Sequence, residues 1–139
     1  MRKINQIIIH CSYTRPSQGV SIEDIKRWHV QENGWREIGY HYVIERDSSI
    51  ARGRQESEIG AHARGSNDDS LGVCLVGGMS EDGSPEFNYT QGQMMALNSL
   101  IHAIKSDHGK GVLISGHNEH DNNKSCPCFN VNSYFRYEA

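Results

Sequence analysis

The feature that most constrains the fold is an almost uninterrupted apolar run, SLGVCLVGG, at residues 70–78. Apolar runs without polar alternation are typical of strands that other elements cover on both faces. A β-branched segment at residues 4–9 predicts a second strand, which ends at His10 and a polar loop. A sheet built from such strands must be flanked by helices, so the sequence favours an α/β fold.

Helix signals occupy two segments, residues 21–34 and 90–109. Each begins with a hydroxyl residue followed three positions later by an acidic or amide residue, the spacing of a capping box, and each ends at a glycine. In the second segment, apolar residues recur at helical spacing: Met94, Leu97, Leu100, Ile101 and Ile104. Residues 38–51 predict a strand, a turn and a short strand, and residues 111–115 a last short strand. We therefore expect a single domain, residues 1–139, with a central mixed β-sheet covered by helices.

Composition limits the classes of function. With 139 residues the chain is long enough for one sizeable core and short for two domains. Its formal net charge of -3 offers no basic surface for nucleic acid. No apolar run approaches the ~20 residues that span a bilayer, and the N-terminal run at residues 7–9 is too short for a signal peptide. We expect a soluble monomer, made in the cytoplasm, with no membrane insertion and no nucleic-acid partner.

Chemistry-bearing residues concentrate in SGHNEHDNNKSCPCFN, residues 115–130, which could be a disordered tail, a disulfide clasp or one wall of a metal site. His10 and His117 each follow a predicted strand, and strand ends of an α/β sheet are where reactive groups collect. With Cys126 they would form a three-ligand zinc set that leaves a fourth position open, as in catalytic sites. Spacing alone leaves the alternative open, a polar surface loop with a free thiol.

Four stretches together make the sequence similar to a known family: IIIHCSYT, GWREIGYHYVIERD, GAHARGSNDDSLGVCLVGG and SGHNEHDNNKSCPCF. They resemble the type 2 N-acetylmuramoyl-L-alanine amidases, in particular the small phage enzymes that are called lysozymes although they are amidases. The same family includes the animal peptidoglycan recognition proteins. The resemblance runs in the same order from about residue 4 to residue 129.

The resemblance implies roles for individual residues. His10 in IIIHCS, His117 in SGH and Cys126 in KSCP match the three ligands of a Zn²⁺ cofactor. Tyr40 in GYH matches the family's catalytic tyrosine, and Lys124 matches its catalytic lysine. The polar stretch would then be a zinc loop at a surface cleft by the strand ends.

Other residues have two interpretations each. His62 in GAHARG matches a cleft position that contacts substrate; the alternative is that it is a structural histidine. Arg54 could bind a stem-peptide carboxylate through two hydrogen bonds; the alternative is a surface ion pair. Cys128, two residues after the third ligand, could compete for the metal. For His120 and Asp121 we favour a solvated loop over extra ligands.

The resemblance implies hydrolysis of the amide between N-acetylmuramic acid and L-alanine in peptidoglycan, with the muropeptide stem as partner. A phage or prophage endolysin, acting on the cell wall after release, is the expected role. Two alternatives are a recognition module that binds muropeptides without cutting them and an interbacterial amidase toxin. Non-catalytic relatives typically lack a metal ligand, whereas this chain has all three, which favours the enzyme.

Overall fold

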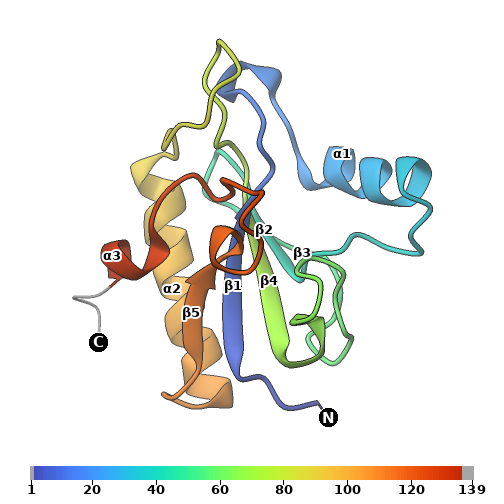
Figure 1. Cartoon of the computed structure of the whole chain (residues 1–139), viewed down its shortest axis with the longest axis vertical. Coiled ribbons are helices and arrows are strands. Elements are labelled where there is room, and N and C mark those ends of the chain that lie inside the picture. The colour runs from blue at the N-terminus through green and yellow to red at the C-terminus, as the bar shows by residue number, and fades with distance from the viewer. Residues whose placement is uncertain (1, 136–139) are drawn as a thin grey trace.

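The apolar run that predicted a covered strand is β4 (Ser70–Leu75) in the computed structural model, which describes residues 2–135. All of its residues are buried. The other strands are β1 (Gln6–Cys11), β2 (Tyr42–Ile44), β3 (Ile50–Arg52) and β5 (Leu113–Gly116). They form one five-stranded sheet in the order β3-β2-β4-β1-β5, parallel except for the antiparallel pair β2–β3. The expected central mixed sheet is confirmed (Figure 1).

The helices are α1 (Ile22–Arg27), α2 (Gln91–His108) and α3 (Val131–Phe135), with α1 continuing into a π-helical turn, η2 (Trp28–Glu32). Short 3-10 turns are η1 (Pro16–Gln18), η3 (Asn67–Asp69) and η4 (His117–Glu119). Both predicted capping boxes are present, with Asp24 accepting from the Ser21 amide and Gln93 from the Thr90 amide. Within the described residues, no helix is both long and apolar enough to cross a membrane.

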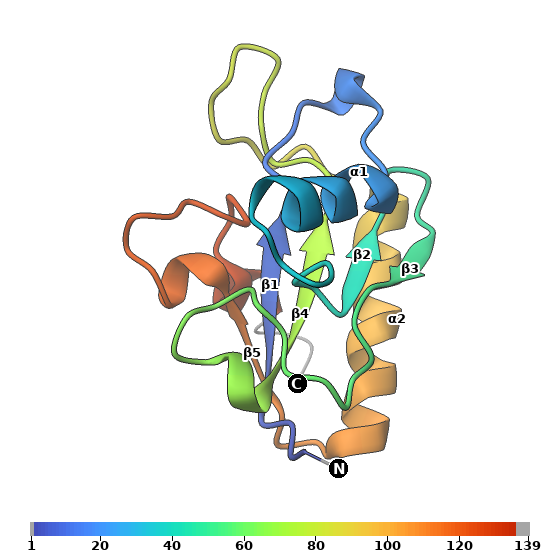
Figure 2. The ribbon, with the colours of Figure 1, turned by 90° about the vertical axis from the view of Figure 1, so that its right-hand side faces the viewer.

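The two faces of the sheet carry different elements. One face packs against α2 through a cluster whose strand members are Ile7, Ile9, Cys11, Tyr42, Ile44, Leu71, Val73 and Leu75. The opposite face packs against α1 through Val43, Cys74 and Val76. Figure 2 shows α1 in front of the strands and α2 behind them. Because strand side chains alternate, His10 lies on the α1 face, away from α2.

Two local predictions differ from the structure. The first strand was expected to end before His10, but β1 continues through Cys11, and His10 is 1% exposed. The reason is that β1 pairs with β4 along its whole length, up to Cys11 opposite Leu75. No local pattern in the sequence specifies this pairing. Helix α3 was not predicted, because its five residues are too few for a recognisable apolar period.

Candidate metal centre

Three side chains converge at the carboxyl ends of β1 and β5. One nitrogen from each of His10 and His117 and the sulfur of Cys126 lie within 4.8 Å of one another. The parallel pairing of β1 with β5 brings the two histidines together, with ring centroids 4.5 Å apart. Cys126 arrives from the following loop, which is anchored because the Asn118 amide donates to the Cys126 carbonyl over 2.8 Å. The structure therefore brings together the three residues that the sequence suggested as ligands.

The chemistry of this donor set fits zinc. Two imidazole nitrogens and one thiolate are ligands that zinc prefers, and ligand atoms around a tetrahedral zinc lie about 3.5 Å apart, which small adjustments would reach. The Cys126 sulfur accepts a hydrogen bond from the Cys11 backbone amide over 2.9 Å, which holds the sulfur beside the end of β1. Burial lowers the pKa of His10 and His117, which keeps both imidazoles in the neutral form that binds metals.

His62 supports the first ligand. Its Nδ1 lies 2.8 Å from Nε2 of His10, and its Nε2 lies 3.2 Å from the hydroxyl of Ser70. If His10 donates from Nε2, its Nδ1 remains for a metal, an arrangement typical of metal-binding histidines. Gly72 makes room for this ring, because a Cβ there would lie 2.6 Å from Cγ of His62. Burial lowers the pKa of His62 to about 3, so this ring is neutral.

A cavity of about 390 Å³ opens beside the candidate ligands. Its walls are formed by Cys11, Tyr13, Tyr40, His117, Asn123, Lys124, Ser125 and Cys126. The ring of Tyr40 lies 5.1 Å from that of His10, and Lys124 comes from the loop that carries Cys126. Burial raises the pKa of Tyr40 well above its usual value, so its hydroxyl is a hydrogen-bond donor at neutral pH. The two residues matched to catalytic positions thus face the same cavity as the candidate ligands His117 and Cys126.

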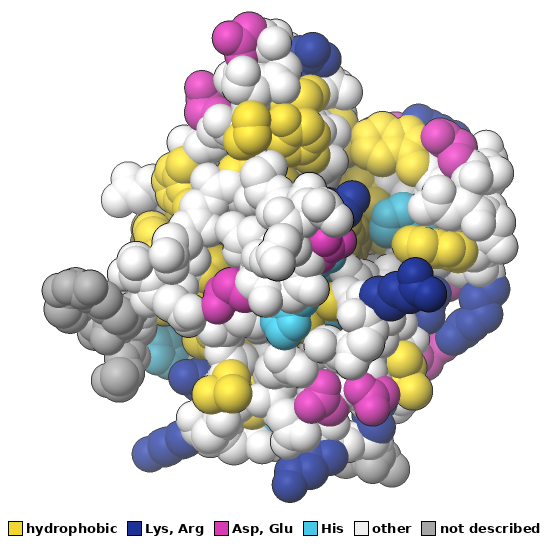
Figure 3. All heavy atoms as spheres, viewed as in Figure 1, with side chains coloured by type: hydrophobic (Ala, Val, Ile, Leu, Met, Phe, Trp, Pro, Cys, Tyr) yellow, Lys and Arg dark blue, Asp and Glu magenta, His cyan; other side chains and the backbone are white. Residues whose placement is uncertain are grey.

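A second cavity, of about 500 Å³, shares His117 with the first. It is lined by Trp35, Ala61, His62, Ala63, Arg64, Asn67, His117, His120 and Asp121. In Figure 3 the surface is hollowed between the part that carries α1 and the centre of the molecule, with histidine and basic side chains at the hollow. The sequence interpretation missed Arg64, although its place inside the GAHARG motif was a usable signal.

Arg54 lines neither of these cavities. It is 8% exposed, and its guanidinium donates to the carbonyls of Ile38 at 2.8 Å and Ile59 at 2.7 Å. The alternative of a surface ion pair is therefore wrong. Contact between Arg54 and a stem-peptide carboxylate stays a prediction that this placement does not favour, because the side chain is buried, lines neither cavity and donates to two backbone carbonyls.

The chain matches the N-acetylmuramoyl-L-alanine amidase family over residues 1–129. It belongs to that family. An endolysin of Enterobacteria phage K11 is 37% identical over 135 residues, which cover 97% of this chain and 87% of that protein.

Solved structures of the family agree with the fold. The endolysin N-acetylmuramoyl-L-alanine amidase LysCS of Clostridium intestinale superposes with a TM-score of 0.82 at 27% identity, covering 99% of this chain and 84% of that one. Drosophila peptidoglycan-recognition protein LB superposes with a TM-score of 0.76 at 26% identity, covering 97% and 81%. The resemblance noted from the sequence motifs is confirmed at the level of family and fold.

Two further histidines near the site, His41 and His120, make contacts within the fold. His41 is fully buried, accepts from the Gly72 amide at Nδ1 and contacts the Glu58 carbonyl through Nε2 at 2.8 Å. His120 lies 2.8 Å from the Ser115 hydroxyl. Within residues 2–135, neither His120 nor Asp121 belongs to the group of possible metal ligands.

We expect His41 to make stability depend on pH. Burial lowers the pKa of His41 from 6.5 to about 4, so the unfolded chain binds a proton more readily than the folded one between these values. The stabilisation from neutral His41 is complete above the unfolded pKa and is lost as pH falls toward 4, up to about 3 kcal/mol. Thermal midpoints of wild type and His41→Gln should therefore differ most at pH 7 and converge toward pH 5.

When wild type and His41→Gln are compared at the same pH, the effects of every histidine that both proteins contain cancel in the difference of their thermal midpoints. His102→Gln is the control, because His102 is exposed on α2 and its substitution should leave the midpoint unchanged at each pH. A difference between wild type and His41→Gln that stays constant from pH 7 to pH 5 would contradict the prediction.

Proposed function

We propose that the chain is a zinc-dependent N-acetylmuramoyl-L-alanine amidase that hydrolyses the bond between the lactyl group of N-acetylmuramic acid and the L-alanine of the stem peptide. The observation that carries this proposal is the convergence of His10, His117 and Cys126 beside a cavity that also holds Tyr40 and Lys124. Membership of the amidase family supports the same chemistry.

Two steps of amide hydrolysis are slow without a catalyst. The carbonyl is weakly electrophilic, which slows attack by water, and the amine is a poor leaving group. Zinc held by the three ligands would supply Lewis acidity that polarises the carbonyl and makes water more acidic. As a ligand, the thiolate of Cys126 would reduce the effective charge of the ion, and the ammonium of Lys124, on the wall of the same cavity, would partly offset that reduction.

The chain's own donors act on the developing negative charge. The protonated hydroxyl of Tyr40 and the ammonium of Lys124 face the same cavity and can both donate to an oxyanion there. His62 holds His10 in the tautomer that leaves Nδ1 for the metal, so it acts as a positioning residue in this proposal. A substrate contact for His62 is compatible with its place on the wall of the adjoining cavity.

The proposed biological role is that of a phage or prophage endolysin that acts on the cell wall after release. The support is the sequence identity with a phage endolysin along almost the whole chain. A recognition module that binds muropeptides without cutting them is less well supported, since a full ligand set with two donors beside it is unnecessary for binding alone.

Digestion of purified peptidoglycan tests the bond that is cut. We expect free L-alanine amino groups to appear, intact stem peptides to be released and the number of reducing sugar ends to stay constant. Amino groups are measured by dinitrophenylation and reducing ends by borohydride consumption on the same digest. New reducing ends without amino groups would show a glycosidase, and binding to peptidoglycan without either product would show a recognition module.

A further inference from the structure

Three of the four cysteines gather around the carboxyl end of β1. The sulfurs of Cys11 and Cys128 lie 3.9 Å apart, and the Cys126 sulfur contacts the backbone of Cys11. Cys74 is excluded from this group, because it is fully buried in the cluster on the α1 face. Neither Cys11 nor Cys128 has a role in the proposed hydrolysis.

We propose that Cys11 and Cys128 form a disulfide when the protein meets a disulfide oxidant, while Cys126 remains free to bind metal. This modification site is independent of the proposed hydrolysis, since it concerns two thiols that are not metal ligands. It would tie the end of β1 to the loop that follows the third ligand.

The two sulfurs are held close by the surrounding chain. Cys11 packs against Gly78, where a Cβ would lie 2.6 Å from the Cys11 sulfur. Tyr89 donates through its hydroxyl to the Pro127 carbonyl at 2.6 Å, which fixes the residue before Cys128. Closing the gap of 3.9 Å to a disulfide bond of about 2.05 Å requires a shift of about 1 Å by each sulfur, within the range of side-chain rotation.

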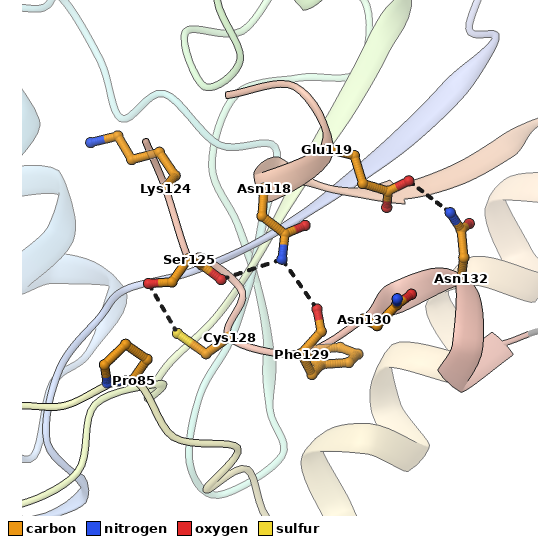
Figure 4. Close-up of a pocket in the computed structure, with 9 residues that line it drawn as sticks. All are labelled: Pro85, Asn118, Glu119, Lys124, Ser125, Cys128, Phe129, Asn130 and Asn132. Carbon is orange, nitrogen blue, oxygen red and sulfur yellow. Dashed lines mark hydrogen bonds between the residues drawn. The ribbon is translucent and has the colours of Figure 1, made fainter. Parts of the chain in front are cut away.

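Cys128 can be reached without passing through the metal cavity. It lies on the wall of a neighbouring cavity of about 500 Å³, together with Pro85, Ser125 and Phe129 (Figure 4). This cavity shares Lys124 and Ser125 with the metal cavity, but Cys128 lines only the neighbouring one. Figure 4 shows its sulfur directed at the Ser125 hydroxyl, at a distance of 4.0 Å. Cys126 lines the metal cavity instead. An oxidant that enters the neighbouring cavity therefore meets Cys128 before Cys11 or Cys126, because neither of those lines it.

The reaction is a two-electron exchange with a small disulfide such as oxidised glutathione. The Cys128 thiol loses its proton, and the thiolate attacks one sulfur of the oxidant, which forms a mixed disulfide and releases one glutathione thiolate. The Cys11 sulfur then attacks the Cys128 sulfur, which forms the Cys11–Cys128 bond and releases the second glutathione. The two thiol protons go to the released glutathiones, so two protein thiols are oxidised and one glutathione disulfide is reduced.

Cys126 is a poorer partner for either thiol. Bound to zinc, its sulfur donates its electron pair to the metal and is less free to attack. A bond between Cys126 and Cys128 would also close a very small ring across Pro127, which disulfide geometry disfavours. The Cys11–Cys128 disulfide leaves Cys126 unmodified, because neither of its two sulfurs belongs to the candidate ligand set of His10, His117 and Cys126.

Mass spectrometry after incubation of the zinc-loaded protein with oxidised glutathione tests the proposal. We expect two of the four thiols to be lost, the peptides containing Cys11 and Cys128 to be linked, and the zinc content to stay at its starting value. Cys126→Ser should still form the link, because its pair of thiols is intact. Cys128→Ser should keep its remaining thiols reduced.

Several results would overturn the proposal. They are a link that contains Cys126, a loss of zinc in step with the loss of thiols, a glutathione adduct on Cys128 that does not resolve, or four free thiols at high oxidant concentration. None of these readouts depends on peptidoglycan hydrolysis, so a failure of the proposed amidase activity would be detected separately.

Discussion

Replacing His117 with alanine is expected to abolish the zinc binding that we propose for the wild-type chain. Protein purified without added metal should contain about one zinc per chain, because His10, His117 and Cys126 supply a set of donors within 4.8 Å of one another. Loss of even a supporting contact typically weakens metal binding 10–100-fold, so loss of a ligand should weaken it more than about 100-fold. Elemental analysis of both proteins after gel filtration measures the ratio, and hydrolysis of peptidoglycan should fall with it.

The two cysteines of the CPC motif give a matched pair of variants for the same measurement. Cys126→Ser should lose or weaken zinc binding, whereas Cys128→Ser should keep zinc, because only Cys126 belongs to the ligand group in the described part of the chain. The opposite pattern would move the third ligand to Cys128. Full retention of zinc by His117→Ala would reject the assignment of the site.

Local sequence signals predicted the helices α1 and α2 and the buried strands well. The capping boxes at Ser21 and Thr90 were readable because their hydrogen bonds join residues three positions apart. The covered strand β4 was readable because both of its faces are apolar. The end of β1 was not, since its last two residues are paired by β4, a strand about 60 residues away in the sequence.

For the candidate site too, local motifs suggested some features, and others depend on how the sheet is assembled. The three candidate ligands and Tyr40 were suggested by motifs. The strand order explains why His10 and His117 meet, because β1 and β5 are neighbours in the sheet. The contact between His62 and His10 could not be predicted from composition or spacing. It depends on the absence of a side chain at Gly72, a feature that becomes meaningful only when the sheet is assembled.

Arg54 shows the limit of matching residue types to roles. An arginine in a polar segment suggests a surface position, but here its guanidinium satisfies two carbonyls, those of Ile38 and Ile59, beneath the loops. Buried carbonyls need donors, and a sequence does not reveal which carbonyls lack one.

Tyr40→Phe and Lys124→Ala are expected to separate catalysis from metal binding. The candidate ligand set of His10, His117 and Cys126 is complete without either residue, so both variants should keep about one zinc per chain. Both residues line the cavity beside that group, where a donor to an oxyanion would stand. Removing one such donor typically lowers the rate ~10²–10³-fold, or about 3–4 kcal/mol of transition-state stabilisation.

The structure makes the two substitutions informative in different ways. Tyr40 is partly buried and packs against the rings of His10 and His29, so phenylalanine preserves these contacts and removes only the hydroxyl. Lys124 is exposed, so alanine should change stability little. A large loss of rate at an unchanged thermal midpoint therefore reports on the reaction rather than on folding.

Zinc content, thermal midpoint and hydrolysis of peptidoglycan should be measured on the same preparations. Asn123→Ala is a matched control for Lys124→Ala, because Asn123 is the neighbouring residue on the same loop and lines the same cavity without carrying a charge. If Lys124→Ala keeps zinc and hydrolyses at more than about a third of the wild-type rate, far short of the loss expected for an oxyanion donor, its catalytic role is wrong. Tyr40, whose raised pKa keeps its hydroxyl protonated, would then be the side-chain donor that remains of the two.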